Sequence, residues 1–177
     1  MKTISLCMIV KDEESTLARC LESVCGLADE IIIADAGSSD KTTEIAEKYT
    51  DNIFSFEWVD DFSKARNFSF SKATSEYIMW LDADDVILAR DRQKLIDWKI
   101  SDDRPDILML PYHAAIDSDG APSLTYYRER ILRRDRAFKW HGAVHEAISP
   151  CGRAVYLDAA VTHMKKVHTP SDRNLKI

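Results

Sequence analysis

The sequence predicts an α/β fold, in which a Rossmann-like, mostly parallel sheet carries helices on both faces and a smaller α+β half follows. Near-continuous apolar runs alternate with segments of helical spacing through residues 1–100. Short polar segments, rich in acidic residues or glycine, close these runs. Beyond residue 100 a turn-rich segment joins two strand-like runs directly. These three observations favour one domain over residues 1–177.

The first elements form two β–α units. We predict a strand over residues 3–10, TISLCMIV, and a helix over residues 17–24, where apolar residues recur at i, i+3, i+4 and i+7. A second continuous apolar run, EIIIADA, covers residues 30–36. The turn-forming GSSDK separates it from a helix around residues 45–49. Strands that alternate with helices in this way are typical of a parallel sheet.

Two further strands enclose a third helix. We predict strands over residues 52–58, NIFSFEW, and 76–84, EYIMWLDAD, with a helix over residues 61–73 between them. We expect the apolar side of this helix to face the core, and not to form a stacking platform. That side consists of Phe62, Ala65, Phe68 and Phe70.

The second half is less regular. A helix around residues 90–100 is followed by strand-like runs at 106–115, DILMLPYHAA, and 124–134, LTYYRERILRR, joined by the turn-rich DSDGAPS. The polar HTPSDRNLKI at the end resumes a helix-like pattern, so we expect the chain to be truncated there. Residues 101–177 therefore form the α+β half.

Composition excludes several classes of function. Lys and Arg total 24 against 30 Asp and Glu, and a net charge of −6 lacks the basic footprint of a nucleic-acid-binding protein. The apolar run from Ile4 to Val10 is too short for a membrane span and lacks a signal cleavage region. Four cysteines without a C-x-x-C pair favour core thiols in a reducing, cytoplasmic compartment. They are Cys7, Cys20, Cys25 and Cys151.

Three carboxylates end the fourth predicted strand. IMWLDADDVIL takes four apolar residues into Asp82, Asp84 and Asp85. Such groups are rarely buried unless they are paired or bind a cation. Hard oxygen donors in a D-x-D pattern select Mg²⁺, Mn²⁺ or Ca²⁺ over zinc. The strand end therefore predicts a divalent cation.

The residues alone leave two kinds of phosphate chemistry open. An apolar strand followed by D-x-D-x-V resembles the nucleophile motif of haloacid-dehalogenase-type phosphotransferases, with Asp82 as nucleophile. Alternatively, a cation on the D-x-D motif neutralises a diphosphate leaving group. This second function needs a nucleotide site, for which Asp35 before a Gly turn and the guanidinium fork of Arg66 are candidates.

Five motifs in order resemble one family. LCMIVKDEE, ADAGSSDKT, DFSKARN, WLDADD and KWHGAVHE are similar to those of family 2 glycosyltransferases of the GT-A fold, especially small bacterial lipopolysaccharide-core and envelope glucosyltransferases. The resemblance implies an inverting, metal-dependent transfer of sugar from a UDP-sugar to an envelope polysaccharide, lipopolysaccharide or other saccharide or lipid-linked hydroxyl. Residues 1–100 would then bind the nucleotide-sugar and residues 101–177 the acceptor.

The resemblance also implies donor-binding residues. The loop after Val10, Asp35 and Arg66 would bind uridine, and Asp82 would lie at the diphosphate. Lys165, with Lys166 beside it, would contact phosphate. Two departures from the family pattern, Asp12 in place of Asn and Ala36 in place of Thr or Asp, affect base and sugar preference.

Metal and catalytic residues follow from the same resemblance. Asp82, Asp84 and His163 would hold Mn²⁺ or Mg²⁺, with Asp85 as a supporting neighbour. Glu146 would be the general base, with Asp158 in reserve, and His145 would orient the acceptor or the donor phosphate. A lipid-linked acceptor would bring the chain to the inner membrane face, and a non-catalytic nucleotide-sugar-binding domain is the remaining alternative.

Overall fold

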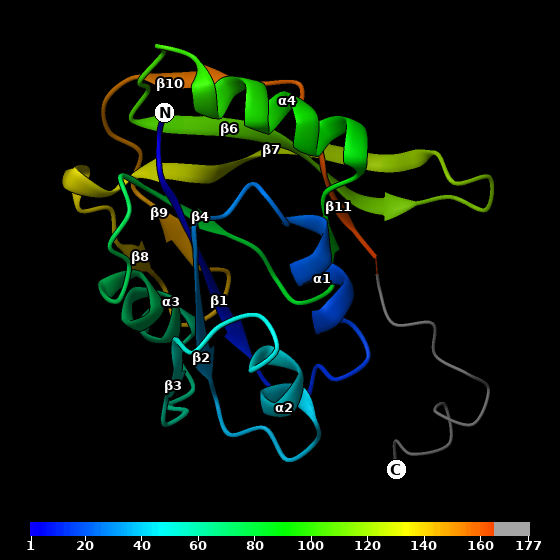
Figure 1. Ribbon diagram of the computed structural model, residues 1–177, viewed down its shortest axis with the longest axis vertical. Coiled ribbons are helices and arrows are strands. Elements are labelled where there is room, and N and C mark those ends of the chain that lie inside the picture. Colours follow the sequence, from blue (N-terminus) through cyan, green and yellow to red (C-terminus); the bar gives the residue numbers. More distant parts are fainter. Residues whose placement is uncertain (165–177) are drawn as a thin grey trace.

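The computed structural model describes residues 1–164, and in that range nine strands form one mixed sheet (Figure 1). The order is β3-β2-β1-β4-β7-β6-β11-β5, with β10 beside β6. The strands are β1 (Ile4–Val10), β2 (Glu30–Asp35), β3 (Ile53–Ser55), β4 (Tyr77–Trp80), β5 (Asp85–Val86), β6 (Ile107–Ile116), β7 (Pro122–Arg133), β10 (Ala154–Tyr156) and β11 (Val161–His163). β8 (Trp140–His141) and β9 (Ala147–Ile148) pair separately.

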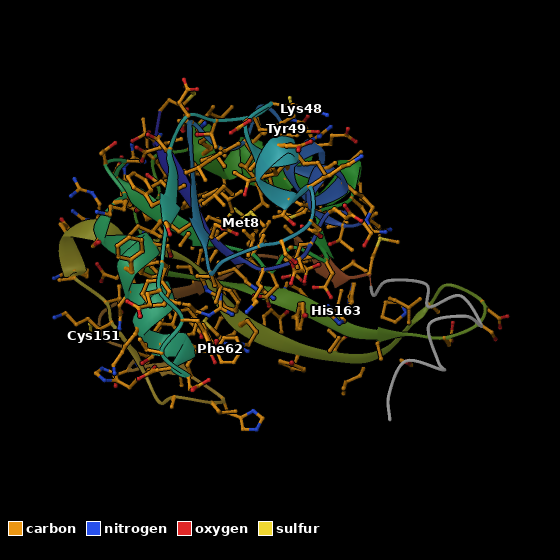
Figure 2. The ribbon with its side chains drawn as sticks, turned by 90° about the horizontal axis from the view of Figure 1, so that it is seen from below. Met8, Lys48, Tyr49, Phe62, Cys151 and His163 are labelled. Atoms are coloured by element: carbon orange, nitrogen blue, oxygen red, sulfur yellow. The ribbon has the colours of Figure 1, made fainter. Side chains whose placement is uncertain are left out.

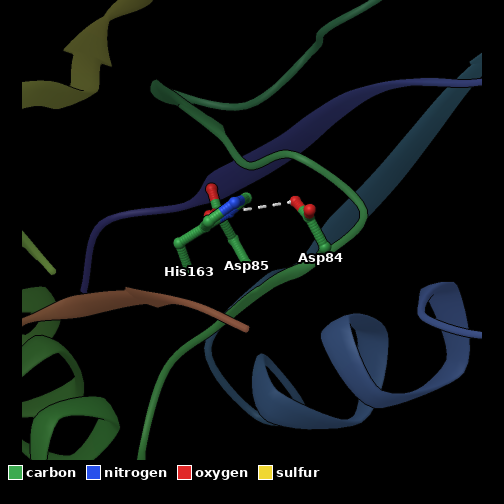
Figure 3. Close-up of side chains that lie close together, drawn as sticks. All are labelled: Asp84, Asp85 and His163. Carbon is green, nitrogen blue, oxygen red and sulfur yellow. Dashed lines mark ion pairs between the residues drawn. The ribbon is translucent and has the colours of Figure 1, made fainter. Parts of the chain in front are cut away.

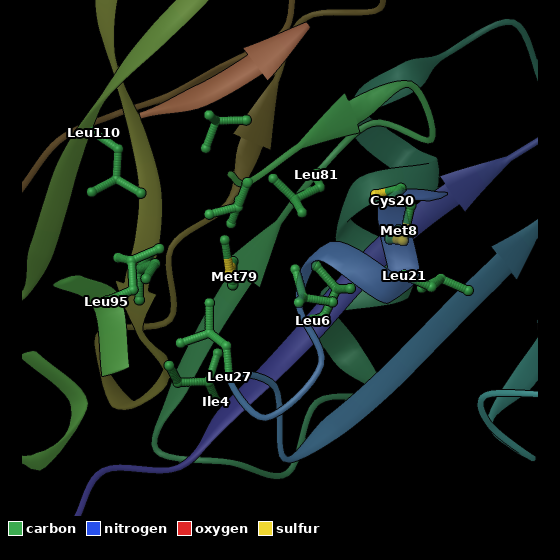
Figure 4. Close-up of a cluster of buried hydrophobic side chains, with 14 of the residues drawn as sticks. Ile4, Leu6, Met8, Cys20, Leu21, Leu27, Met79, Leu81, Leu95 and Leu110 are labelled. Atoms are coloured by element: carbon green, nitrogen blue, oxygen red, sulfur yellow. The ribbon is translucent and has the colours of Figure 1, made fainter. Parts of the chain in front are cut away.

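Helices cover both faces of the sheet, as the alternating pattern predicts. Leu6 and Met8 of β1 face a core that contains α1 (Leu17–Ser23), α2 (Thr42–Ala46) and α4 (Ala89–Ile100) (Figure 4). Cys7 points the other way, into a second core that includes Phe70 of α3 (Phe62–Ser71). Because successive side chains of a strand point to opposite faces, a continuous apolar strand supplies both cores.

The second half extends the sheet with antiparallel pairs. β7 runs antiparallel to β4 and to β6, and the long β6–β7 hairpin projects beyond α4 (Figure 1). β11 returns parallel to β6 and antiparallel to β5, in a register that pairs His163 with Asp85. A strand near the end of the chain is thereby placed against the acidic segment after β4.

Helix α3 differs from the prediction. Ala65 and Phe70 are buried, but Phe62 is 40% exposed and Arg66 is only 7% exposed. The predicted apolar side is therefore wrong in part, because a charged side chain takes the inward position. The third strand is also shorter than predicted and ends at Ser55.

Two of the cysteines match the prediction of core thiols. Cys7 and Cys20 are buried, whereas Cys25 and Cys151 are exposed, and all four are reduced. Burial raises the pKa of the Cys20 thiol well above its usual range, aided by the nearby carboxylate of Asp85. Within the described residues, every helix is too short or too polar to cross a bilayer.

Candidate functional site

A cavity of about 290 Å³ opens where the parallel strands end. Val10 at the end of β1 and Ala36 after β2 form one side, and Phe62 and Arg66 of α3 form another. The other lining residues are Ile9, Lys11, Glu13, Trp58, Asp82, Ala83 and Asp84. Ligands of open α/β sheets bind outside the carboxyl ends of the strands, so this cavity lies where a nucleotide is expected. Figure 2 views this side of the molecule, with Phe62 and His163 labelled.

A second cavity, of about 430 Å³, lies between α3 and the β6–β7 hairpin. Three residues, Phe62, Arg66 and Asp82, line both cavities. The remainder of its lining is Trp80, Tyr112, Tyr126, Arg128, Arg130, Val144, His145 and Glu146. The two spaces therefore meet at Arg66 and Asp82.

The charged side chain of Arg66 lies where the two cavities meet. Its Nη2 lies 2.8 Å from Oδ1 of Asp82, and its Nε lies 2.6 Å from Oε1 of Glu146. The guanidinium packs against two rings that also contact each other, and lies 4.6 Å from the centroid of Trp80 and 4.9 Å from that of Trp140. Burial acts to lower the pKa of Arg66, but the two carboxylates outweigh it and the pKa is raised. A permanently charged arginine thus joins the D-x-D motif to the loop that contains Glu146.

Asp82 is held by arginines. Burial acts to raise the pKa of its carboxyl, but the guanidinium groups of Arg66 and Arg130 outweigh burial and lower it. The Asp82 backbone amide donates to Oδ2 of Asp85 at 3.1 Å, which fixes the turn after β4. Asp82 is therefore an ionised group whose direct partner is a protein cation.

Three residues that follow Asp82 in the sequence form a cluster of potential metal ligands. Ligand atoms of Asp84, Asp85 and His163 all lie within 4.8 Å of one another (Figure 3). Nδ1 of His163 is 3.3 Å from Oδ1 of Asp84 and 3.6 Å from Oδ1 of Asp85. The sequence placed Asp82 in this group, whereas the structure has Asp85 in that position and Asp82 on Arg66.

These residues fit a divalent cation. Two carboxylates and an imidazole are acceptable ligands for Mn²⁺. Oδ1 of Asp85 is buried, and Nδ1 of His163 lies 3.6 Å from it. Burial, together with Asp85 and Asp82, raises the pKa of Asp84, against the opposing effect of His163. Asp84, which lies close to two other carboxylates, is the group of the cluster that a bound cation would stabilise most directly.

Arg130 is a site residue that the sequence reasoning missed. It is fully buried on β7, and its Nη1 lies 3.0 Å from Oδ2 of Asp85. Its guanidinium also lies 3.9 Å from the centroid of the Trp80 ring and 4.4 Å from that of Tyr112. An arginine directly before the apolar pair Ile131 and Leu132 was the available signal. Arg130 therefore pairs with one oxygen of the Asp85 carboxylate, and His163 lies near the other.

Replacing Arg130 by Ala should strongly destabilise the fold. The change leaves Asp85 buried without its ion-pair partner, which typically costs about 3–5 kcal/mol. Urea denaturation without metal would measure the free energy of unfolding. Arg128→Ala is the matched control: this neighbour is 27% exposed, so its loss should cost only about 1 kcal/mol or less. Equal stability of both variants would contradict this role of Arg130.

The loop that contains Glu146 is attached to α3 at several points. The side chain of Asn67 forms two hydrogen bonds with the backbone of Trp140. Its Nδ2 donates to the Trp140 carbonyl and its Oδ1 accepts from the Trp140 amide, both at 2.9 Å. The Phe62 amide donates to the Ala143 carbonyl at 2.9 Å. Asn67 is thus a positioning residue next to Arg66.

The other predicted residues are more dispersed. His145 is exposed, has a positive φ of 56° and lines the second cavity. Asp35 is not among the residues that line the first cavity, and both its carboxylate oxygens accept hydrogen bonds from Ser38. Asp158 has a 91% exposed side chain beside Lys94. Lys165 and Lys166 lie outside the described residues.

Asp12 is part of a loop contact. Its carboxylate accepts from the backbone amide and hydroxyl of Ser39, and the first of these bonds chiefly lowers its pKa. Its own amide donates to Ser38. Asp12 thereby ties the loop after β1 to the loop after β2.

Two curated proteins show how far the sequence similarity extends along this chain. The SPbeta prophage-derived glycosyltransferase SunS of Bacillus subtilis is 29% identical over 186 residues, which cover 98% of this chain and 42% of SunS. A TPR repeat-containing protein of Synechococcus elongatus is 46% identical over 88 residues, covering 50% of this chain and 22% of that protein. The chain therefore spans less than half the length of these curated relatives.

Solved structures share the fold at low sequence identity. S. aureus TarS 1–349 in complex with UDP-GlcNAc superposes with a TM-score of 0.69 and 17% identity, over 94% of this chain and 60% of that one. Glucosyl-3-phosphoglycerate synthase from Mycobacterium tuberculosis, in complex with Mn²⁺ and UDP-glucose, gives a TM-score of 0.52 and 20% identity, over 63% and 44%. The fold is thus that of the GT-A glycosyltransferases.

The family itself is shown by sequence. The model of glycosyl transferase family 2 matches residues 5–155, from β1 into β10. This range includes the D-x-D motif, Arg66 and Glu146. The chain belongs to glycosyl transferase family 2.

Proposed function

We propose that this chain transfers a sugar from a UDP-sugar to an acceptor hydroxyl, with inversion at the anomeric carbon and with the aid of Mn²⁺ or Mg²⁺. The observation that carries the proposal is Arg66, which joins Asp82 and Glu146 where the two cavities meet. In this arrangement a donor in the first cavity points its sugar toward the second. UDP-GlcNAc bound to TarS and Mn²⁺ with UDP-glucose bound to the mycobacterial synthase support the choice of donor and metal.

We assign one substrate to each of the two cavities. Every residue that lines the first cavity comes from residues 1–100, which supports a nucleotide-sugar-binding half. The second cavity adds residues 112–146 from the other half, 101–177, which we assign to the acceptor. Aromatic side chains such as Tyr126 suit a saccharide or lipid-linked hydroxyl. A lipid-linked acceptor would bring the second cavity to the membrane face.

The residues of the chain have distinct roles in the transfer. Asp84, Asp85 and His163 would hold the cation, which when bound supplies positive charge to the departing diphosphate. Glu146 accepts the acceptor proton as the hydroxyl oxygen forms its bond to C1. The bond between C1 and the β-phosphate oxygen breaks, and its electron pair leaves with UDP. Arg66 orients the Glu146 carboxylate through Oε1, and a carboxylate has a second oxygen for the proton.

Calorimetric titration of UDP, with and without Mn²⁺, tests this function. We expect micromolar binding that depends on Mn²⁺, because UDP without the cation would bring two phosphates to an acidic cluster. Turnover is then measured as release of UDP from a panel of UDP-sugars. Absence of UDP binding under both conditions would overturn the proposal, as would a phosphorylated Asp82 after incubation with phosphate donors.

A further inference from the structure

Two aromatic side chains that contact each other, Trp58 and Phe62, line the first cavity. Trp58 follows β3 and packs edge-on against Phe62, with ring centroids 4.8 Å apart and an interplanar angle of 72°. Its indole Nε1 donates to Oδ1 of Asp60 at 2.9 Å. Asp60 adopts a positive φ of 53°, a conformation that few non-glycine residues take. The ring is therefore held from its edge and from its N–H end.

Trp58 differs from the other tryptophans of the chain. Trp80, Trp98 and Trp140 are 2%, 6% and 2% exposed, and each packs in the protein interior. Trp58 is only partly buried and lines the first cavity. Indole surface that faces a cavity, with its N–H already satisfied, is available for a ligand that presents a flat π system.

Strand order decides which end of the cavity Trp58 occupies. The order β3-β2-β1-β4 places the segment after β3 and the carboxylates after β4 on opposite sides of β2 and β1. The Phe56 amide donates to the Asp35 carbonyl at 2.8 Å, so the segment that leads to Trp58 stays beside the end of β2. Trp58 thus lies at the apolar end with Ala36 and Val10, and Asp84 lies at the charged end.

We propose that Trp58 stacks on the nucleobase of the donor, with Asp60 as the residue that positions its ring. This inference rests on the proposed function and names a residue within it. A nucleoside diphosphate has one apolar, planar end and one anionic end, and the cavity has the same polarity. When the diphosphate lies at the cation cluster, the base is directed toward the β2–β3 side. Every base has a π face, so an aromatic side chain can stack on it without forming a hydrogen bond.

The test compares three tryptophan variants with two ligands. Trp58→Ala should weaken Mn²⁺-dependent UDP binding by between about 5-fold and 150-fold, the range for loss of one stacked base. Trp58→Phe keeps a ring and should lose much less affinity. In the parent chain and in the Trp98→Phe control, UDP should quench tryptophan emission, and in Trp58→Phe this quenching should disappear.

Inorganic pyrophosphate separates the base from the diphosphate. Calorimetry with Mn²⁺ and pyrophosphate should give the same affinity for Trp58→Ala as for the parent chain, because pyrophosphate has no base. Equal loss for UDP and pyrophosphate would mean that Trp58 supports the fold or the diphosphate site, and would overturn the inference. Unchanged UDP affinity in Trp58→Ala would overturn it while leaving the proposed function intact. A parent chain that binds no UDP would overturn both.

Discussion

Replacing Glu146 by Gln should lower turnover by about 10²–10⁴-fold while leaving UDP affinity within a few-fold of the parent. The amide can still accept the hydrogen bond from Nε of Arg66, so the loop should keep its position. It cannot take the proton of the acceptor hydroxyl. The expected loss is therefore in the chemical step, measured as UDP release at saturating donor, with calorimetry for UDP binding.

Asp158→Asn is the control for this experiment. Asp158 is the other carboxylate that the sequence offers as a base, but its side chain is 91% exposed, is paired with Lys94 and lines neither cavity. We expect its variant to turn over like the parent. Full activity of Glu146→Gln, or a larger loss in Asp158→Asn, would remove Glu146 from the role of base.

Replacing Asp84 by Asn should abolish the effect of Mn²⁺ on UDP binding, with a loss of more than about 100-fold in Mn²⁺-dependent affinity. A neutral amide is a poor substitute for a carboxylate on a hard cation, and Asp84 is one of only two carboxylates in the described cluster. Calorimetric titration of UDP across a series of Mn²⁺ concentrations measures the effect.

Asp82→Asn distinguishes the two acids of the D-x-D motif. Asp82 contacts Arg66 and lies outside the described cluster, so its variant should still respond to Mn²⁺. Its expected defect is in turnover, because one of the two anchors of Arg66 is weakened. If Asp82→Asn lost the response to Mn²⁺ and Asp84→Asn kept it, the cluster would be wrongly assigned.

The strands and the position of the site could be read from the sequence. Continuous apolar runs such as residues 30–36 can be stable only inside a sheet covered on both faces, and acidic residues at the end of the fourth run mark the functional edge. The structure has β1, β2 and β4 in parallel and places Asp84 at their carboxyl ends. His163 lies beside Asp84, and its role as a metal ligand stays a prediction.

Contacts across long sequence separations could not be derived in the same way. Arg66 and Glu146 are 80 residues apart, and the motif DFSKARN by itself does not indicate that its arginine is buried against two tryptophan rings. The choice between Asp82 and Asp85 depends on the register of β11 against β5, which pairs His163 with Asp85. A register is a property of two strands together, so a single-residue pattern does not specify it.

The three attachments of α3 to residues 140–146 have a consequence for the entropy of catalysis. Asn67 holds the Trp140 backbone, the Phe62 amide holds Ala143, and Arg66 holds Glu146. A catalytic group on an untethered loop must be ordered again in each turnover, which raises the barrier. Here the ordering takes place once, when the chain folds, so the proposed base Glu146 and its partner Arg66 are held as one preorganised unit.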